Sequence, residues 1–123
     1  MDTDNTRPAV TGAIEIKQQA LFSLALGAAL STYGVVGIAS RYTGYDVTRR
    51  EPRRGLSVKV RRNEDGSHSV MVNINIIVEY GVRIQAVTSS LQQQITYAIE
   101  KNTDYRVDTV NVHVTSLRVT HED

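Results

Sequence analysis

The side chains of this chain best suited to binding chemistry are arginines, and they are concentrated in one segment. Residues 41–62, RYTGYDVTRREPRRGLSVKVRR, hold eight basic and two acidic residues, so this segment carries +6 and the rest of the chain carries −5. Guanidinium groups bind phosphate and carboxylate oxygens through paired hydrogen bonds. The candidate contact residues are Arg49, Arg50, Arg53, Arg54, Arg61 and Arg62.

The sequence is compatible with three roles for this arginine-rich segment. It could contact the headgroups of anionic lipids, to which each basic residue near the surface contributes ~1 kcal/mol. It could bind nucleic acid, with Tyr42 and Tyr45 stacking on bases. It could also face solvent alone, as a loop that leads into a hairpin. Pro52 lacks the amide donor that a central strand needs, so we expect residues 49–54 to form a mobile loop.

The groups that most often perform catalysis or bind metals are absent or scattered. The chain has no cysteine, which excludes disulfides, thiolate zinc sites and a cysteine nucleophile. His68, His113 and His121 do not have the spacing of zinc ligands. No Gly-x-Ser-x-Gly turn and no glycine-rich phosphate loop occurs. We therefore predict no catalytic, cofactor-binding or metal site and no enzymatic activity, although a carboxylate pair assembled by folding would escape this search.

Length and composition indicate one globular domain. The 123 residues are 41% apolar and 22% charged, and a chain of this size can bury a core without disulfides. The polar, acidic N-terminus does not resemble a secretory signal, and we expect a cytoplasmic protein. Residues 20–39 are uncharged and long enough to span a membrane, but Ser, Thr, Tyr and Gly interrupt them at residues 31–34. We predict a helix followed by a buried strand there.

Hydrophobic periodicity predicts the element order β-α-β-β-β-α-β. We expect a strand at 11–16, a helix at 17–33, a strand at 35–40, a hairpin of strands 55–62 and 67–80, a helix at 82–102, and a strand at 107–114 that ends or bulges near Thr115. This order predicts an α/β (α+β) two-layer sandwich, with two helices on one face of a mixed sheet. The domain should span residues 12–119, between a flexible arm at 1–11 and a flexible tail at 120–123.

Two asparagines interrupt the apolar run of the longest strand without interrupting its core face. Val70, Val72, Ile74, Ile76, Val78 and Tyr80 share one parity, whereas Asn73, Asn75 and Glu79 share the other with Met71 and Ile77. Successive side chains of a strand point to opposite faces, so the asparagines should lie away from the helices. Asn73 and Asn75 are therefore candidate interaction residues. The small residues of the first helix could pack inside the domain or form a second self-association surface.

The second half of the chain resembles the signature of the alkaline shock protein family, the envelope stress response proteins of Gram-positive bacteria. A valine-rich strand ends in Tyr80-Gly81, and the next helix contains Ile84 and Leu91-Gln92. The last strand has the pattern of Val107, Val110, Asn111, Val112 and Val114. GAIEI and YGVVGIAS in the first half also fit, so the resemblance covers residues 12–119.

The resemblance implies a non-catalytic scaffold of the cell-envelope stress response. Such a protein self-associates into a homo-oligomer and is recruited to the cytoplasmic side of the membrane by a membrane-anchored protein partner. Two features depart from the family: NTDYR replaces its usual Thr-Gly before the last strand, and the TRREPRRG loop has more arginines than expected. The second departure leaves open another partner or direct contact with anionic lipid. The alternative function is a nucleic-acid-binding module that uses residues 41–62.

Overall fold

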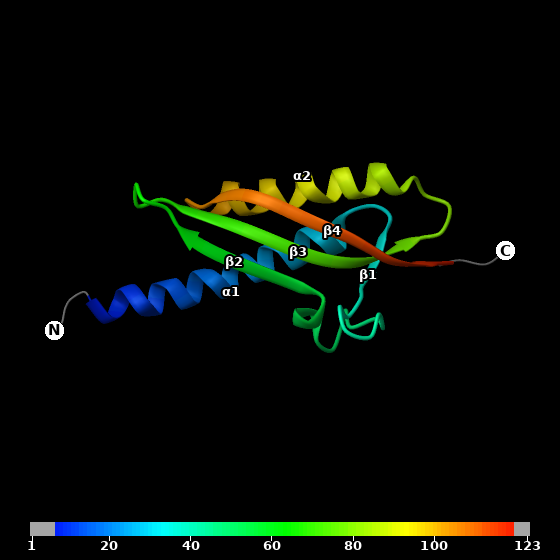
Figure 1. Cartoon of the computed structure of the whole chain (residues 1–123), viewed down its shortest axis with the longest axis horizontal. Helices are drawn as coiled ribbons and strands as arrows, with labels where there is room; N and C mark the ends of the chain where they lie inside the picture. Colours follow the sequence, from blue (N-terminus) through cyan, green and yellow to red (C-terminus); the bar gives the residue numbers. More distant parts are fainter. Residues whose placement is uncertain (1–6, 120–123) are drawn as a thin grey trace.

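A computed structural model describes residues 7–119 of the chain, with side chains from residue 18 onward. Two helices and a four-stranded sheet form a two-layer α+β fold (Figure 1). The elements are α1 (Arg7–Ser31), β1 (Val35–Ile38), the short 3₁₀ helix η1 (Pro52–Arg54), β2 (Leu56–Arg62), β3 (His68–Glu79), α2 (Ile84–Asn102) and β4 (Arg106–Arg118). No helix within residues 7–119 is long and apolar enough to cross a membrane.

Strand β3 is the centre of a mixed sheet. β2 pairs antiparallel with its first half, with Leu56 opposite Ile74, and β1 pairs antiparallel with its last residues, with Val35 opposite Val78. β4 runs parallel to β3 from Ser69 to Glu79. Because β4 occupies one edge of β3 along this length, β1 and β2 must share the other edge.

Both helices pack on the same face of this sheet. Five of the six residues of the predicted core parity are fully buried, whereas Tyr80 lies beyond the end of β3 and is 67% exposed. Leu91, Ile95 and Ile99 of α2 are also fully buried. Leu21, Ala25 and Ala29 of α1 are also fully buried in the same cluster, so small residues of α1 serve packing inside the domain. The predicted two-layer arrangement and the parity of β3 are confirmed.

The predicted strand at residues 11–16 is wrong. These residues lie inside α1, which also includes residues 7–11 of the arm that we expected to be flexible. Val10, Ile14 and Leu21 recur at helical spacing as well, so the short alternation in TGAIEI does not distinguish helix from strand. Extending a helix adds one hydrogen bond per residue, whereas a strand needs a partner, and none of the described strand pairs includes residues 11–16. Residues 1–6 and 120–123, which include His121, lie outside the described residues.

Several turns and irregularities lie where the sequence predicted them. Gly34 ends the segment after α1 with a φ of 93°, and Gly66 closes the β2–β3 hairpin with a φ of 91°. The pairing of β3 with β4 passes from Val114 directly to Ser116, which leaves Thr115 as the extra residue of a bulge. The helix that ends at Ser31 and the strand that begins at Val35 confirm the reading of residues 20–39.

Candidate interaction surfaces

Residues 39–55, here called the arginine loop, have a defined backbone fold. We expected a mobile loop, but Val47 N donates to the Ile38 carbonyl at 2.8 Å, and the Ile38 amide donates to Thr48 Oγ1 at 2.7 Å. The amide of Arg41 donates to the carbonyl of Arg54 at 2.9 Å, which ties the two ends of the loop together. These contacts hold the loop against β1 and fix where its arginines lie.

Aromatic rings orient three of the loop arginines. The guanidinium carbon of Arg53 lies 4.5 Å from the centre of the Phe22 ring, and those of Arg41 and Arg54 each lie 5.5 Å from the centre of the Tyr42 ring. Arg54 also forms an ion pair with Glu51 at 3.4 Å. Cation–π contacts at exposed sites contribute ~0.5–1 kcal/mol each, which is enough to favour one orientation of the side chain.

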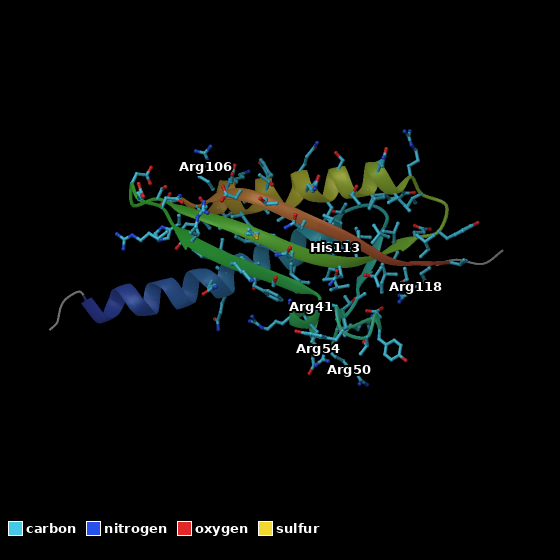
Figure 2. The ribbon with its side chains drawn as sticks, in the orientation of Figure 1. Arg41, Arg50, Arg54, Arg106, His113 and Arg118 are labelled. Carbon is cyan, nitrogen blue, oxygen red and sulfur yellow. The ribbon has the colours of Figure 1, made fainter. Side chains whose placement is uncertain are left out.

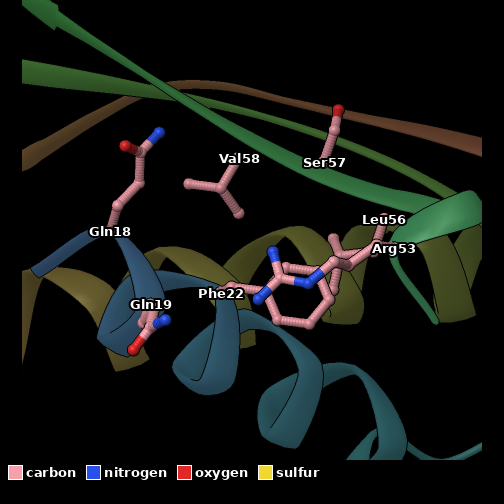
Figure 3. Close-up of a pocket in the computed structure, with 7 residues that line it drawn as sticks. All are labelled: Gln18, Gln19, Phe22, Arg53, Leu56, Ser57 and Val58. Carbon is pink, nitrogen blue, oxygen red and sulfur yellow. The ribbon is translucent and has the colours of Figure 1, made fainter. Parts of the chain in front are cut away.

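Arg53 and Phe22 border an open hollow of about 530 Å³ between α1 and β2. Figure 3 shows the guanidinium of Arg53 against the Phe22 ring, with Gln18 of α1 and Val58 of β2 nearby. Its lining combines amide groups with apolar side chains of β2. Arg50 and Arg53 also line a smaller neighbouring hollow to which Phe22 contributes, so Arg50 borders the surroundings of Arg53.

Arg49 and Arg50 line a second hollow, together with Arg118 from the end of β4. Arg118 Nη2 donates to Asp46 Oδ2 at 2.9 Å, and Asp46 Oδ1 accepts from the amide and the hydroxyl of Thr48. Burial of the Asp46 carboxyl would raise its pKa, but the hydrogen bonds from Thr48 and Arg118 outweigh burial and hold the pKa below its ordinary value of 3.8. The carboxylate therefore stays ionised at neutral pH.

The remaining two predicted arginines lie elsewhere. Arg61 and Arg62 end β2 at the hairpin, about seven residues from Arg54, which corresponds to roughly 20 Å along a strand. Arg61 forms an ion pair at 3.1 Å with Asp108 of β4. The structure thus brings Arg49, Arg50, Arg53 and Arg54 into one loop but does not join them with Arg61 and Arg62; Figure 2 labels Arg41, Arg50 and Arg54 at the loop.

The sheet face opposite the helices is a second candidate surface, here called the open sheet face. The strand register places Asn73 between Ser57 of β2 and Asn111 of β4, and Asn111 Nδ2 donates to Asn73 Oδ1 at 3.0 Å. Met71 is 42% exposed on this face. The face comprises Ser57, Lys59, Arg61, Met71, Asn73, Asn75, Thr109, Asn111 and His113. The predicted pair Asn73 and Asn75 therefore belongs to a larger polar surface.

Two residues that line the hollow beside Arg49 and Arg50, namely Asp46 and Arg118, were not predicted from the sequence. They are 72 positions apart, and no local pattern links them. By contrast, the neighbours of Asn73 on β2 follow from counting back through the hairpin turn.

The two histidines in the described part of the chain, His68 and His113, do not form a metal site. His113 lies opposite Asn75 on the open sheet face, and His68 stacks on Tyr105 with ring centres 4.7 Å apart. Within residues 7–119, no three His, Cys, Asp or Glu side chains gather as a metal site would require.

Comparison with known proteins links nearly the whole chain to one family. The matching family model is that of the alkaline shock protein 23 family, which is described as having a cell envelope-related function, and it covers residues 6–119. The chain is 32% identical over 113 residues to the uncharacterized protein YloU of Bacillus subtilis, covering 89% of this chain and 92% of that protein. It is 26% identical over 115 residues to the uncharacterized protein Spy1614 of Streptococcus pyogenes serotype M6, covering 91% and 93%. It is also 25% identical over 119 residues to the uncharacterized protein YqhY of Bacillus subtilis, covering 96% and 84%.

Proposed function

This chain belongs to the alkaline shock protein family, which has a cell envelope-related function, and we propose that it acts there as a self-associating, non-catalytic scaffold. In this proposal the open sheet face joins copies of the chain. The arginine loop contacts an anionic partner at the cytoplasmic side of the membrane, to which a membrane-anchored protein recruits the assembly.

The open sheet face supports self-association through its composition. Asparagine side chains contain both donors and acceptors, so one amide-rich face can pair with a second copy of itself about a twofold axis. The Asn73–Asn111 contact already orders one row of amides on this face. Met71, which is exposed in the first half of β3, offers an apolar contact to a second copy. A polar face of this kind can bind specifically without the aggregation risk of a large apolar patch.

Sedimentation equilibrium over a wide concentration range tests the proposed assembly. Wild-type protein should form species larger than a monomer. The double variant Met71→Lys/Asn75→Lys should weaken association at least roughly tenfold, or about 1.4 kcal/mol, because each pair of copies then brings four added positive charges together. Both positions are at least partly exposed, so the fold should persist.

A matched control places the same two charges on the opposite layer. Ser89→Lys/Gln93→Lys changes exposed residues of α2 and should associate as the wild type does. A wild-type protein that stays monomeric at all concentrations would refute the assembly. If both double variants weaken self-association equally, the effect comes from net charge rather than from the open sheet face.

One observation favours the alternative of a nucleic-acid-binding module. Tyr42 and Tyr45 are 71% and 76% exposed, and Tyr42 lies against Arg41 and Arg54. Exposed rings beside guanidinium groups can stack on unpaired bases. If RNA of mixed sequence binds far more tightly than anionic vesicles, with a steep dependence on salt, the nucleic-acid function replaces the membrane contact of the loop.

A further inference from the structure

The hollow beside Arg49 and Arg50 is built from two distant parts of the chain. It has a volume of about 580 Å³ and lies between the arginine loop and the end of β4. Its lining consists of Val36, Asp46, Thr48, Arg49, Arg50 and Arg118. Figure 2 labels Arg50 at the loop and Arg118 at the end of β4. Three arginines from distant positions, Arg49, Arg50 and Arg118, thus line one space.

Hydrogen bonds fix the base of this hollow. Thr48 Oγ1 accepts from the amide of Ile38 in β1 and gives its own proton to Asp46 Oδ1. The other carboxylate oxygen of Asp46 accepts from Arg118 Nη2. A guanidinium group has five N–H donors, so Arg118 keeps donors for a further ligand. Asp46 therefore orients Arg118 toward the hollow without consuming its binding capacity.

The charge of the hollow is not balanced by its own residues. Among the described residues, neither Arg49 nor Arg50 lies within ion-pair distance of a carboxylate. Glu79 is the register neighbour of Arg118 on β3 but does not line the hollow. Three arginines against the single carboxylate of Asp46 leave a charge of +2. A ligand with two negative charges would neutralise it.

We propose that this hollow binds a phosphate monoester. A monoester carries about −1.5 to −2 at pH 7, and its three oxygens accept paired hydrogen bonds from guanidinium forks. A single carboxylate would leave the hollow positively charged. The volume exceeds that of a phosphate group, so the group attached to the phosphate can also enter. The proposal rests on the proposed anionic contact of the arginine loop, and it names the ligand as either a lipid headgroup or a soluble phosphate ester.

Titration with inorganic phosphate at constant ionic strength, followed by amide chemical shifts, tests the site. Phosphate should saturate one site and shift the amides of Thr48, Arg50 and Arg118. Arg49→Gln/Arg50→Gln should weaken binding at least about tenfold, because two of the three guanidinium groups are lost. Arg62→Gln/Arg106→Gln removes the same charge at the hairpin end of the sheet and should bind as the wild type does.

Arg118→Gln tests the third guanidinium group separately. It should also weaken phosphate binding, and its amide spectrum shows whether the loop keeps its fold without the contact to Asp46. Shifts spread over all basic surfaces, without saturation, would overturn the site. Equal weakening of phosphate binding in the two double variants would also overturn the site, because binding would then depend only on a diffuse basic surface.

Vesicles distinguish the two sources of the ligand. Phosphatidylcholine vesicles containing phosphatidate present a monoester, and vesicles with the same surface charge from phosphatidylglycerol present a diester. Preference for phosphatidate, competed by inorganic phosphate, supports a headgroup in the hollow. Saturable phosphate binding without vesicle binding supports a soluble ester. Sedimentation of the same arginine variants separates this site from the assembly, because loss of phosphate binding should leave self-association unchanged.

Discussion

Arg49 and Arg53 lie within five positions of the sequence, yet they face different surroundings. Arg53 packs on Phe22 of α1, whereas Arg49 lines the hollow that Arg118 completes, and Arg50 borders both regions. A count of charges along the sequence cannot make this distinction. At the scale of the residue, the chemistry of each arginine depends on the ring, carboxylate or cavity that the fold places beside it.

Asp46 should make stability depend on pH in the acid range. Its pKa is lowered in the folded state, so its contribution is complete above about pH 5 and is lost as pH falls below about pH 4. Asp46→Asn should lower the free energy of unfolding at pH 7 by roughly 0.5–1 kcal/mol, a small value because the Asp46 side chain is 36% exposed and solvent screens its interactions. Urea unfolding at pH 7, 5 and 3 should show the difference from wild type shrinking at pH 3.

The control for this pH dependence is Asp104→Asn, which removes an exposed carboxylate outside the hollow. It should leave the free energy of unfolding nearly unchanged at all three pH values. A constant difference between Asp46→Asn and wild type from pH 7 to pH 3 would show that ionisation of Asp46 does not stabilise the fold.

At the scale of the element, the arginine loop depends on a close backbone contact between its two ends, beside β1. A Cβ atom at Gly55 would lie 2.1 Å from the carbonyl oxygen of Ala39, closer than any real contact allows. Gly55→Ala should therefore displace the loop or β2 and cost about 1–3 kcal/mol of stability, the usual range for overpacking. Thermal unfolding measures the loss.

A second glycine provides the matched control for Gly55. Gly27 lies in the interior of α1, and a Cβ atom there would meet nothing within 4 Å. Gly27→Ala should therefore raise stability by about 0.5–1 kcal/mol, because alanine favours a helix over glycine. A Gly55→Ala variant as stable as Gly27→Ala would mean that the contact with Ala39 is not a constraint.

Periodicity predicted the elements best where tertiary packing and local pattern agree. The alternation in β3 correctly placed the alternate valines and isoleucines from Val70 to Val78 in the core and Asn73 and Asn75 on the other face, but Ile77 on that other face is buried as well. The change of parity near Thr115 revealed the bulge. At residues 11–16 the pattern was compatible with both helix and strand, and extension of α1 prevailed. Local sequence was insufficient there because a strand also requires a neighbouring strand, which a local pattern does not specify.

The candidate interaction surfaces could be predicted only in part, because some of their contacts join residues that are distant in the sequence. The asparagine face follows from the twofold period of one strand, and the loop arginines follow from composition. The contact between Arg118 and Asp46 depends on the parallel pairing of β4 with β3 and on the path of the arginine loop. Neither is determined by neighbouring residues, so the hollow could not be located from the sequence.

At the scale of the whole molecule, one layer of helices covers one face of the sheet and leaves the other face polar. The segment with most of the positive charge forms the arginine loop and β2, and β2 contributes Ser57, Lys59 and Arg61 to the open sheet face. Copies joined through the open sheet face would combine their arginine loops in one assembly. An assembly of this kind would present several basic loops to one anionic surface and gain avidity.

Cross-linking through a single introduced cysteine tests the central claim, self-association through the open sheet face, most directly. The chain has no cysteine, so Met71→Cys places one thiol on the open sheet face and Ser89→Cys places one on the exposed face of α2. With a short bismaleimide at matched concentrations, Met71→Cys should form covalent dimers that increase with protein concentration, while Ser89→Cys should remain monomeric. A monomeric Met71→Cys beside an efficiently cross-linked Ser89→Cys would contradict the account.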